Sequence, residues 1–306
     1  MTADAALSLA YSHCERITRS RARNFYYGIR LLPPRKRAAM CALYAMARRI
    51  DDVGDDLYRE AATSSRLSAL AQVRGSLAMV AKAATERSVS APPGDPVLMA
   101  LVDAARQFPL PVAALEELVE GCEWDLAGRQ YDNFDHLVEY CRRVAGTIGR
   151  LSLAIYGSAD DQLAEPLADA LGVALQLTNI LRDLAEDRDL MGRVYLPRED
   201  LERFGVGPHL EGSTDDLMAL VCFESARAAQ WYERGMPLLH LLDHRSRACT
   251  AAMAGIYRRL LDKIRSRPDA VMWRRVGLSA GEKAAVAALA LAGAWPDRAG
   301  LSRGRP

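Results

Sequence analysis

Apolar residues recur at steps of three and four along most of this chain, which is the period of an α-helix with one buried face. Proline and glycine clusters separate the periodic stretches and mark where the helices end. A central helix is expected from about residue 172, followed by a flap over 189–197. The other helices predicted from the pattern cover residues 4–22, 35–57, 66–82, 97–107, 111–127, 134–157, 215–243, 246–266 and 279–294. The predicted fold class is therefore all-α.

Two features modify this series of helices without dividing it. Residues 85–96 (TERSVSAPPGDP) form the most loop-like stretch, and we interpret them as a surface connection because helical patterning resumes at Val97. Gly146 and Gly149 interrupt the helix predicted over 134–157, each lowering helix propensity by about 1 kcal/mol relative to alanine. They indicate close packing or a kink at that point.

One face of the central helix is polar although its surroundings are apolar. Gln176, Asn179, Asp183 and Asp187 recur at three- and four-residue steps, so they lie roughly above one another on a helix. The apolar positions within 173–184 supply the surface that a buried helix needs. Two carboxylates four residues apart repel each other by about 0.2 to 0.5 kcal/mol, so a positive group should lie near them.

A second stretch repeats this arrangement. Asp51 and Asp55 are again four residues apart, with a parallel acidic pair one residue further on, and Tyr44 and Arg48 continue the face toward the N-terminus. Taken alone, either stretch could be a solvated acidic edge balanced by neighbouring arginines. Two facing helices with such pairs could instead hold several Mg²⁺ ions, which take oxygen ligands and leave places for water and substrate phosphate.

These residues, taken together, resemble the squalene and phytoene synthase family of head-to-head isoprenoid condensing enzymes. The matching segments follow the family's order and spacing: RNFYYGIRLLP at 23–33, the acidic helix at 44–56, YCRRVAGTIG at 140–149, QLTNILRDLAED at 176–187 and RVYLP at 193–197. The resemblance implies one isoprenoid-synthase helical bundle over residues 1–306, with its core at about 10–285 and a central active-site cavity. Ala22 and Asn24 depart from the family, which has small hydroxyl residues there.

The resemblance also implies roles for individual residues. Catalytic roles fall on Tyr44, Arg48, Tyr140 and Tyr257. Substrate binding falls on Phe25, Arg48, Gln176, Asn179, Arg182, Tyr195 and Arg275. The metal ligands would be Asp51, Asp55, Asp183 and Asp187, holding Mg²⁺ with Mn²⁺ as the alternative ion. The acids of the segment 120–125 (EGCEWD) are candidates for a supporting role at the metal site, or ordinary helix-surface acids.

Within the family, residues 23–56 look most like the presqualene diphosphate synthases of hopanoid pathways. The expected reaction is therefore condensation of two farnesyl diphosphates to presqualene diphosphate. Phytoene synthase, using two geranylgeranyl diphosphates, and NADPH-dependent squalene synthase are the enzymatic alternatives; a non-catalytic assembly protein of the same fold is the alternative of another class. NADPH is not expected, although the lack of a GxGxxG fingerprint does not decide this, because squalene synthases bind NADPH without one.

Composition excludes some partners. The formal net charge of +1 gives no basic footprint for nucleic acid. The six cysteines are scattered without a CxxC pair, so we expect small buried residues in a reducing compartment. The N-terminus lacks a signal-peptide pattern, and residues 284–295 are apolar but too short to span a bilayer. We expect a cytoplasmic protein, with a peripheral membrane contact through 284–295 as one reading and a packed terminal helix as the other.

Overall fold

Helices make up most of the chain, and no strand occurs in the part that the computed structural model describes, which is residues 2–22, 24–54, 63–86, 88–89, 91–92 and 94–294. Buried apolar side chains from Ala10 to Val286 form one continuous core cluster. The predicted all-α fold, a single helical domain, is therefore confirmed. The proposed limits of the domain and of its core remain predictions.

The helices follow one another with short connections. Up to Tyr156 the elements are α1 (Ala3–Arg21), α2 (Tyr26–Ile29), α3 (Pro34–Gly54), α4 (Thr63–Thr85), α5 (Pro96–Gln107), α6 (Ala113–Leu126), α7 (Phe134–Cys141), the π-helix η2 (Arg142–Gly146) and α8 (Thr147–Tyr156). After it come α9 (Asp161–Met191), α10 (Arg198–Arg203), α11 (Thr214–Gly235), the 3₁₀-helix η3 (Met236–Leu241), α12 (His244–Ser266), the 3₁₀-helix η4 (Pro268–Met272) and α13 (Ala280–Leu291).

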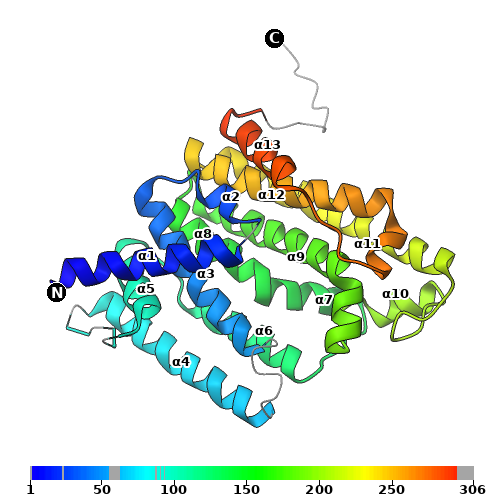
Figure 1. Cartoon of the computed structure of the whole chain (residues 1–306), viewed down its shortest axis with the longest axis horizontal. Coiled ribbons are helices and arrows are strands. Elements are labelled where there is room, and N and C mark those ends of the chain that lie inside the picture. The colour runs from blue at the N-terminus through cyan, green and yellow to red at the C-terminus, as the bar shows by residue number, and fades with distance from the viewer. Residues whose placement is uncertain are drawn as a thin grey trace.

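Helix α9 is the element around which the others pack. It has 31 residues and is about 46 Å long, and it runs through the middle of the molecule in Figure 1. Helices α8, α11 and α12 pack against it. Asp160 caps its start by accepting a hydrogen bond from the Leu163 amide, and Gly192 ends it in the left-handed conformation with φ of 63°.

Glycines allow α9 to approach the α7–α8 segment at backbone contact. A Cβ atom at Gly172 would lie 2.5 Å from the carbonyl oxygen of Ala145, and one at Gly149 would lie 2.4 Å from that of Ala168. The stretch predicted as one helix over 134–157 is divided by the π-helix η2, which ends at Gly146. Gly146 and Gly149 therefore mark both a change of helical type and a close packing of helices.

Several predicted boundaries were wrong. The helix expected over 215–243 ends at Gly235, where a Cβ atom would lie 2.6 Å from the Leu171 amide nitrogen, and the chain continues as 3₁₀-helix η3 with Pro237 near its start. Helix α9 extends to Met191, so the expected flap is limited to 192–197. The short helices α2, α10 and η4 were not predicted, because they are too short to show a periodic pattern.

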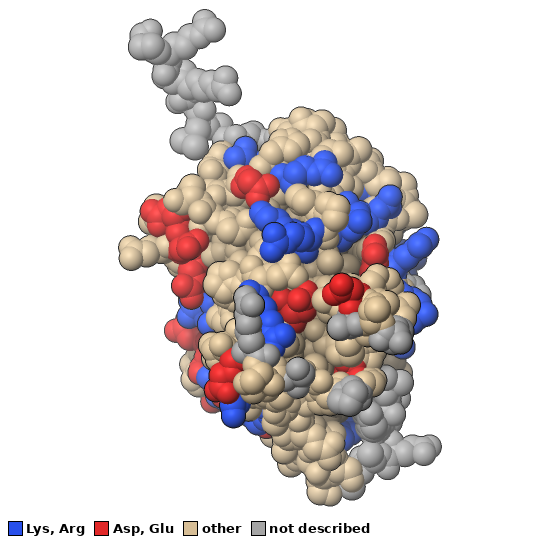
Figure 2. All heavy atoms as spheres, turned by 90° about the vertical axis from the view of Figure 1, so that its left-hand side faces the viewer, with Lys and Arg blue, Asp and Glu red and all other residues tan. Residues whose placement is uncertain are grey.

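Surface charge, helix length and cysteine burial can be compared with what was expected from the composition. On the face shown in Figure 2, basic side chains are more frequent in the upper half, with acidic and uncharged side chains between them. No helix in the described part of the chain is both long and apolar enough to span a bilayer. All six cysteines are free thiols; five are buried as expected, but Cys222 is exposed.

Candidate active site

A cavity of about 820 Å³ lies between the helices, with polar residues at one end and apolar residues at the other. Its walls come from α3, α6, α7, η2, α8, α9 and α12 and from the segments around Phe25, Tyr195 and Arg275. The polar end carries side chains from the C-terminal halves of α3 and α9, including Asp51 and Asp183. The apolar end is formed by the N-terminal parts of the same two helices, at Met40 and Ala168.

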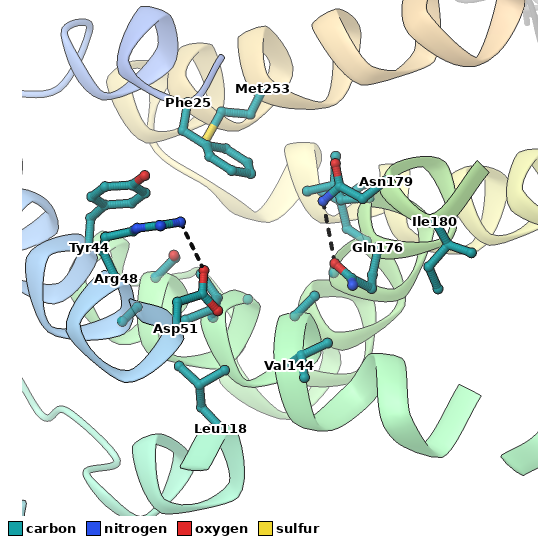
Figure 3. A pocket seen from close by; sticks show the side chains of 18 of the residues that line it. Phe25, Tyr44, Arg48, Asp51, Leu118, Val144, Gln176, Asn179, Ile180 and Met253 are labelled. Carbon is teal, nitrogen blue, oxygen red and sulfur yellow. Dashed lines mark hydrogen bonds and ion pairs between the residues drawn. The ribbon is translucent and has the colours of Figure 1, made fainter. Parts of the chain in front are cut away.

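Twelve of the predicted site residues line this cavity. They are Phe25, Tyr44, Arg48, Asp51, Tyr140, Gln176, Asn179, Arg182, Asp183, Asp187, Tyr195 and Arg275. Tyr257 does not line it; its ring stacks on Phe25 with 5.4 Å between the ring centres. Asp55 lies outside the described residues. Figure 3 shows Tyr44, Arg48 and Asp51 on one side of the pocket, facing Gln176 and Asn179 on the other.

The acidic face of α3 is balanced by its own arginine. Arg48 forms ion pairs with Asp51, at 3.5 Å from Nη1 to Oδ2, and with Asp52. The Asp51 side chain is 51% exposed and therefore accessible to a ligand from the cavity mouth. One turn before Arg48, burial raises the pKa of Tyr44 to about 12, so its phenol stays protonated at neutral pH.

On α9, two arginines hold Asp183. The Arg182 Nε donates to Asp183 Oδ1 at 2.8 Å, and the Arg275 Nε lies 2.9 Å from the same oxygen. Arg275 also reaches Glu186, at 3.4 Å from Nη1 to Oε2. Burial by itself lowers the pKa of Arg182, but its hydrogen bonds to Asp183 and Tyr257 raise that pKa above the usual value. Tyr257 thus contacts the cavity residue Arg182 from outside the cavity lining.

Asp187 is a partly buried carboxyl group that lies near two other acidic side chains. Burial, followed by repulsion from Asp183 and Glu186, raises the pKa of Asp187 to about 7, against the attraction of Arg193. Carboxylates near the C-terminus of a helix are also disfavoured by its dipole. A bound cation at this end of the cavity would relieve both effects.

The amide pair of α9 leaves an acceptor for a ligand. Asn179 Nδ2 donates to Gln176 Oε1 at 3.3 Å, whereas the buried Asn179 Oδ1 has no hydrogen-bond partner within the described structure. An unpartnered buried acceptor is costly unless a donor or cation binds it. Its position one turn before Asp183 places it with the carboxylates.

The donor chemistry fits a hard divalent cation. Asp51, Asp183, Asp187 and Asn179 all offer oxygen atoms to one cavity end, as Mg²⁺ requires. Among the described residues, no three His, Cys, Asp or Glu side chains are grouped closely enough to hold an ion by themselves. Mg²⁺ commonly binds through one or two carboxylates together with water and substrate phosphate, so such a spread set is compatible with it.

Asp125, Arg193 and Glu186 line the cavity but were not predicted as individual site residues. Asp125 accepts hydrogen bonds from Tyr140 and Tyr195, whereas Glu120 and Glu123 of the same segment point to Arg143 and Arg74 and do not line the cavity. Glu120, Glu123 and Asp125 had been given the same candidate role from the sequence. Arg193 and Glu186 also line the cavity; Arg193 belongs to the same RVYLP segment as Tyr195, which was the available signal.

The comparisons with known proteins agree with this geometry. The family model described as Squalene/phytoene synthase matches residues 18–282. The chain belongs to the squalene/phytoene synthase family. The reaction of this family is head-to-head condensation of prenyl diphosphates, and the family generally depends on divalent metal ions. The resemblance noted from the sequence motifs is therefore confirmed.

Individual relatives cover nearly the whole chain. A curated protein named phytoene synthase from Mycobacterium tuberculosis is 49% identical over 289 residues, covering 92% of this chain and 91% of that protein. Another phytoene synthase, from Arthrospira platensis, is 37% identical and covers 86% of each chain. Among solved structures, a dehydrosqualene synthase in complex with ligand has a TM-score of 0.82 at 29% identity, covering 94% of this chain and 97% of the other.

A second solved structure, described as squalene synthase HpnC from Alicyclobacillus acidocaldarius, has a TM-score of 0.74 at 28% identity. It covers 85% of this chain and 95% of its own. The family and the helical fold are thus shared by relatives whose names give different products.

Proposed function

We propose that this protein condenses two geranylgeranyl diphosphates head to head to form phytoene, with release of diphosphate. The observation that carries the proposal is the cavity itself: carboxylates and an unpartnered amide oxygen from α3 and α9 lie at one end of a deep apolar space. An amphiphile with a diphosphate head and a long hydrocarbon chain matches that polarity along its whole length.

The choice of the longer substrate rests on relatives and on depth. Two curated relatives that cover most of the chain are named phytoene synthase. Asp187 and Ala168 both line the cavity, and they are 19 residues or about 28 Å apart along α9. Such depth suits a prenyl chain of four isoprene units.

Asp51, Asp183 and Asp187 would hold Mg²⁺ in this mechanism, with Asn179 as a further oxygen donor. The ion, when bound, supplies positive charge that stabilises the departing diphosphate. Arg48, lying at the α3 side of the polar end, would orient the diphosphate of one substrate. A guanidinium matches phosphate oxygens with several parallel donors, so it fixes direction as well as charge.

Ionisation of one substrate leaves an allylic carbocation in the apolar part of the cavity. Residues such as Leu43, Val144 and Ile148 line that part and exclude water, which would otherwise trap the cation as an alcohol. The double bond of the second chain attacks the cation, and loss of a proton closes a cyclopropane. The second diphosphate then leaves this intermediate, the ring rearranges, and loss of a second proton gives phytoene. The ring faces of Tyr44 and Tyr140 would stabilise the positive charge.

The second candidate reaction is condensation of two farnesyl diphosphates to presqualene diphosphate, which is the product predicted from the sequence. Its support is the likeness to solved structures described as a dehydrosqualene synthase and a squalene synthase, at 29% and 28% identity. A later reduction by NADPH would make the product squalene instead.

Product analysis separates these candidates. Purified protein is incubated with Mg²⁺ and either geranylgeranyl or farnesyl diphosphate, with and without NADPH, and the products are identified by mass. We expect a C40 hydrocarbon from geranylgeranyl diphosphate, formed without NADPH. A C30 cyclopropyl diphosphate as the favoured product would replace the proposal with presqualene diphosphate synthase, and squalene formed only with NADPH would replace it with squalene synthase. Absence of any product would indicate the non-catalytic assembly protein.

A further inference from the structure

Asp125 joins two tyrosines in the cavity wall. It lies in the last turn of α6, where the Tyr140 hydroxyl donates to its Oδ2 at 2.9 Å and the Tyr195 hydroxyl donates to its Oδ1 at 3.0 Å. The two phenols come from different elements, α7 and the segment 192–197. One carboxylate therefore fixes two side chains that are 55 residues apart in the sequence.

The rings of these two tyrosines pack together with the ring of Tyr131. The ring centres of Tyr140 and Tyr195 are 5.3 Å apart, and Tyr131 lies 5.3 Å from Tyr140 and 6.4 Å from Tyr195. Backbone bonds reinforce the arrangement, because the Arg198 amide donates to the Tyr131 carbonyl at 2.8 Å. The segment 192–197 is thus anchored to the region between α6 and α7 at the cavity side.

Asp125 also changes the pKa values of its neighbours in this wall. Burial, followed by the negative charge of Asp125, raises the pKa of Tyr140 and of Tyr195 well above the usual value, so both phenols remain donors. Arg193, which also lines the cavity, has a positive charge that balances the carboxylate. A phenol has one proton, and each hydroxyl here donates it in a hydrogen bond to the carboxylate, so the phenol oxygens offer only lone pairs to their other neighbours.

The geometry points to Asp125 as a positioning residue, not a metal ligand: its carboxylate holds Tyr140 and Tyr195 in place, keeping the wall closed to water while the prenyl cation exists. This inference rests on the proposed function, because it assigns the network to protection of that reaction's cation. Both Asp125 oxygens already accept a hydrogen bond from a phenol, and a metal would have to displace those bonds. The Asp51 side chain, by contrast, is 51% exposed at the mouth of the cavity.

The test compares Asp125→Asn with Asp51→Asn under saturating substrate. An asparagine keeps the shape of the aspartate but replaces one acceptor oxygen with a donor, so one phenol loses its partner. We expect Asp125→Asn to raise the ratio of prenyl alcohol to coupled product at least about 10-fold, with KM and the Mg²⁺ concentration for half-maximal activity within twofold of wild type. Asp51→Asn should instead raise the Mg²⁺ requirement.

A matched control and a second readout keep the inference falsifiable. Glu120→Gln changes an acid of the same helix that pairs with Arg143 outside the cavity, and it should leave the product ratio unchanged. Trypsin cleavage after Arg193 reports on the anchored segment without any turnover. It should accelerate several-fold in Asp125→Ala and in Tyr195→Phe, and not in Glu120→Gln.

The outcomes are distinguishable from failure of the proposed function. Wild-type protein that makes no coupled product would reject the proposed function itself. Coupled product from wild type, with an unchanged alcohol ratio in Asp125→Asn, would overturn the positioning role. A raised Mg²⁺ requirement in Asp125→Asn equal to that of Asp51→Asn would make Asp125 a metal ligand, and unchanged trypsin cleavage in Asp125→Ala would show that it does not anchor the segment.

Discussion

Carboxylates that face the cavity differ in their surroundings from those that face water on the same helices. Asp51 and Asp183 line the polar end, where the proposed function assigns them to the Mg²⁺ that balances the diphosphate charge. We expect Asp51→Asn and Asp183→Asn each to lower kcat/KM by about 100-fold or more, since preorganised charge is the main catalytic contribution of such sites. Product formation at saturating Mg²⁺ is the measurement.

Helix α9 provides the control for this prediction. Asp189 lies six residues after Asp183, is exposed and pairs only locally with Arg188, at 2.7 Å from Nε to Oδ1. Asp189→Asn should keep kcat/KM within about twofold of wild type, because a surface ion pair contributes little. An equal loss in Asp189→Asn and Asp183→Asn would mean that the effect comes from helix stability and not from the cavity.

Another residue-scale prediction concerns two buried carboxyls that share one arginine. Asp200 and Glu224 are 2% and 3% exposed, and both contact Arg227. Burial, with repulsion from Asp200, raises the pKa of Glu224 to about 8, against the attraction of Arg227. Because this folded-state pKa lies above the unfolded value, the folded protein retains a proton that the unfolded chain loses between about pH 4.5 and 8.

Stability should therefore fall as the pH rises through that window and level off above it. One proton corresponds to a slope of at most about 1.4 kcal/mol per pH unit. Urea unfolding of wild type and Glu224→Gln at pH 5, 6.5 and 8 tests this, and we expect the variant to show the flatter dependence. Parallel curves for the two proteins would contradict the assignment.

At the scale of elements, the contact between α9 and the α7–α8 segment depends on glycine. A methyl group at Gly172 would meet the Ala145 carbonyl at 2.5 Å, and a backbone atom has little freedom to move. We expect Gly172→Ala to destabilise the protein by about 1 to 3 kcal/mol, although alanine is the better helix former. Gly75→Ala, on α4 with open space around it, should be neutral or stabilising by up to about 1 kcal/mol. Urea unfolding measures both, and equal effects would contradict the close packing.

The same contact shows what the sequence could and could not predict about the elements. Glycines 146 and 149 indicated close packing or a kink, and the structure shows close packing together with a π-helix, but periodicity contains no information on the type of helix that results. Long helices were found because three or more turns establish a period. The end of α11 was missed because Gly235 is required by its approach to Leu171, a tertiary contact that no local pattern reveals.

Site residues were predictable where one helix face carries several of them. The stripe on α9 from Gln176 to Asp187 was visible as a period of three and four, and it does face the cavity. Asp125 comes from α6, so its contact with Tyr195 depends on the packing of α6 against the segment after α9. Tyr257 was predicted to face the cavity, but it packs behind the wall residue Phe25. Sequence order does not distinguish residues that line a cavity from residues that support its wall.

For the whole molecule, the polarity gradient of the cavity sets which substrates fit. In the proposed binding mode the diphosphate lies at Asp183, and Ala168 lies 15 residues earlier on the same helix, or about 22 Å along its axis. At that far end α3 meets α8, since the Lys36 ammonium donates to the Tyr156 carbonyl oxygen, and Tyr156 also lines the cavity. A prenyl chain anchored at its head must therefore end before this junction.

Filling the far end should consequently discriminate by chain length. Ala168→Leu adds three carbons to a buried wall position and leaves the polar end unchanged. We expect it to lower kcat/KM for geranylgeranyl diphosphate about 10-fold more than for farnesyl diphosphate, because only the longer chain reaches that depth. Leu163→Ala, an exposed change on the same helix, should leave the ratio unaltered. Equal losses for both substrates would contradict this discrimination by depth. No loss for either substrate would mean that the chains end before Ala168 and that another part of the wall selects their length.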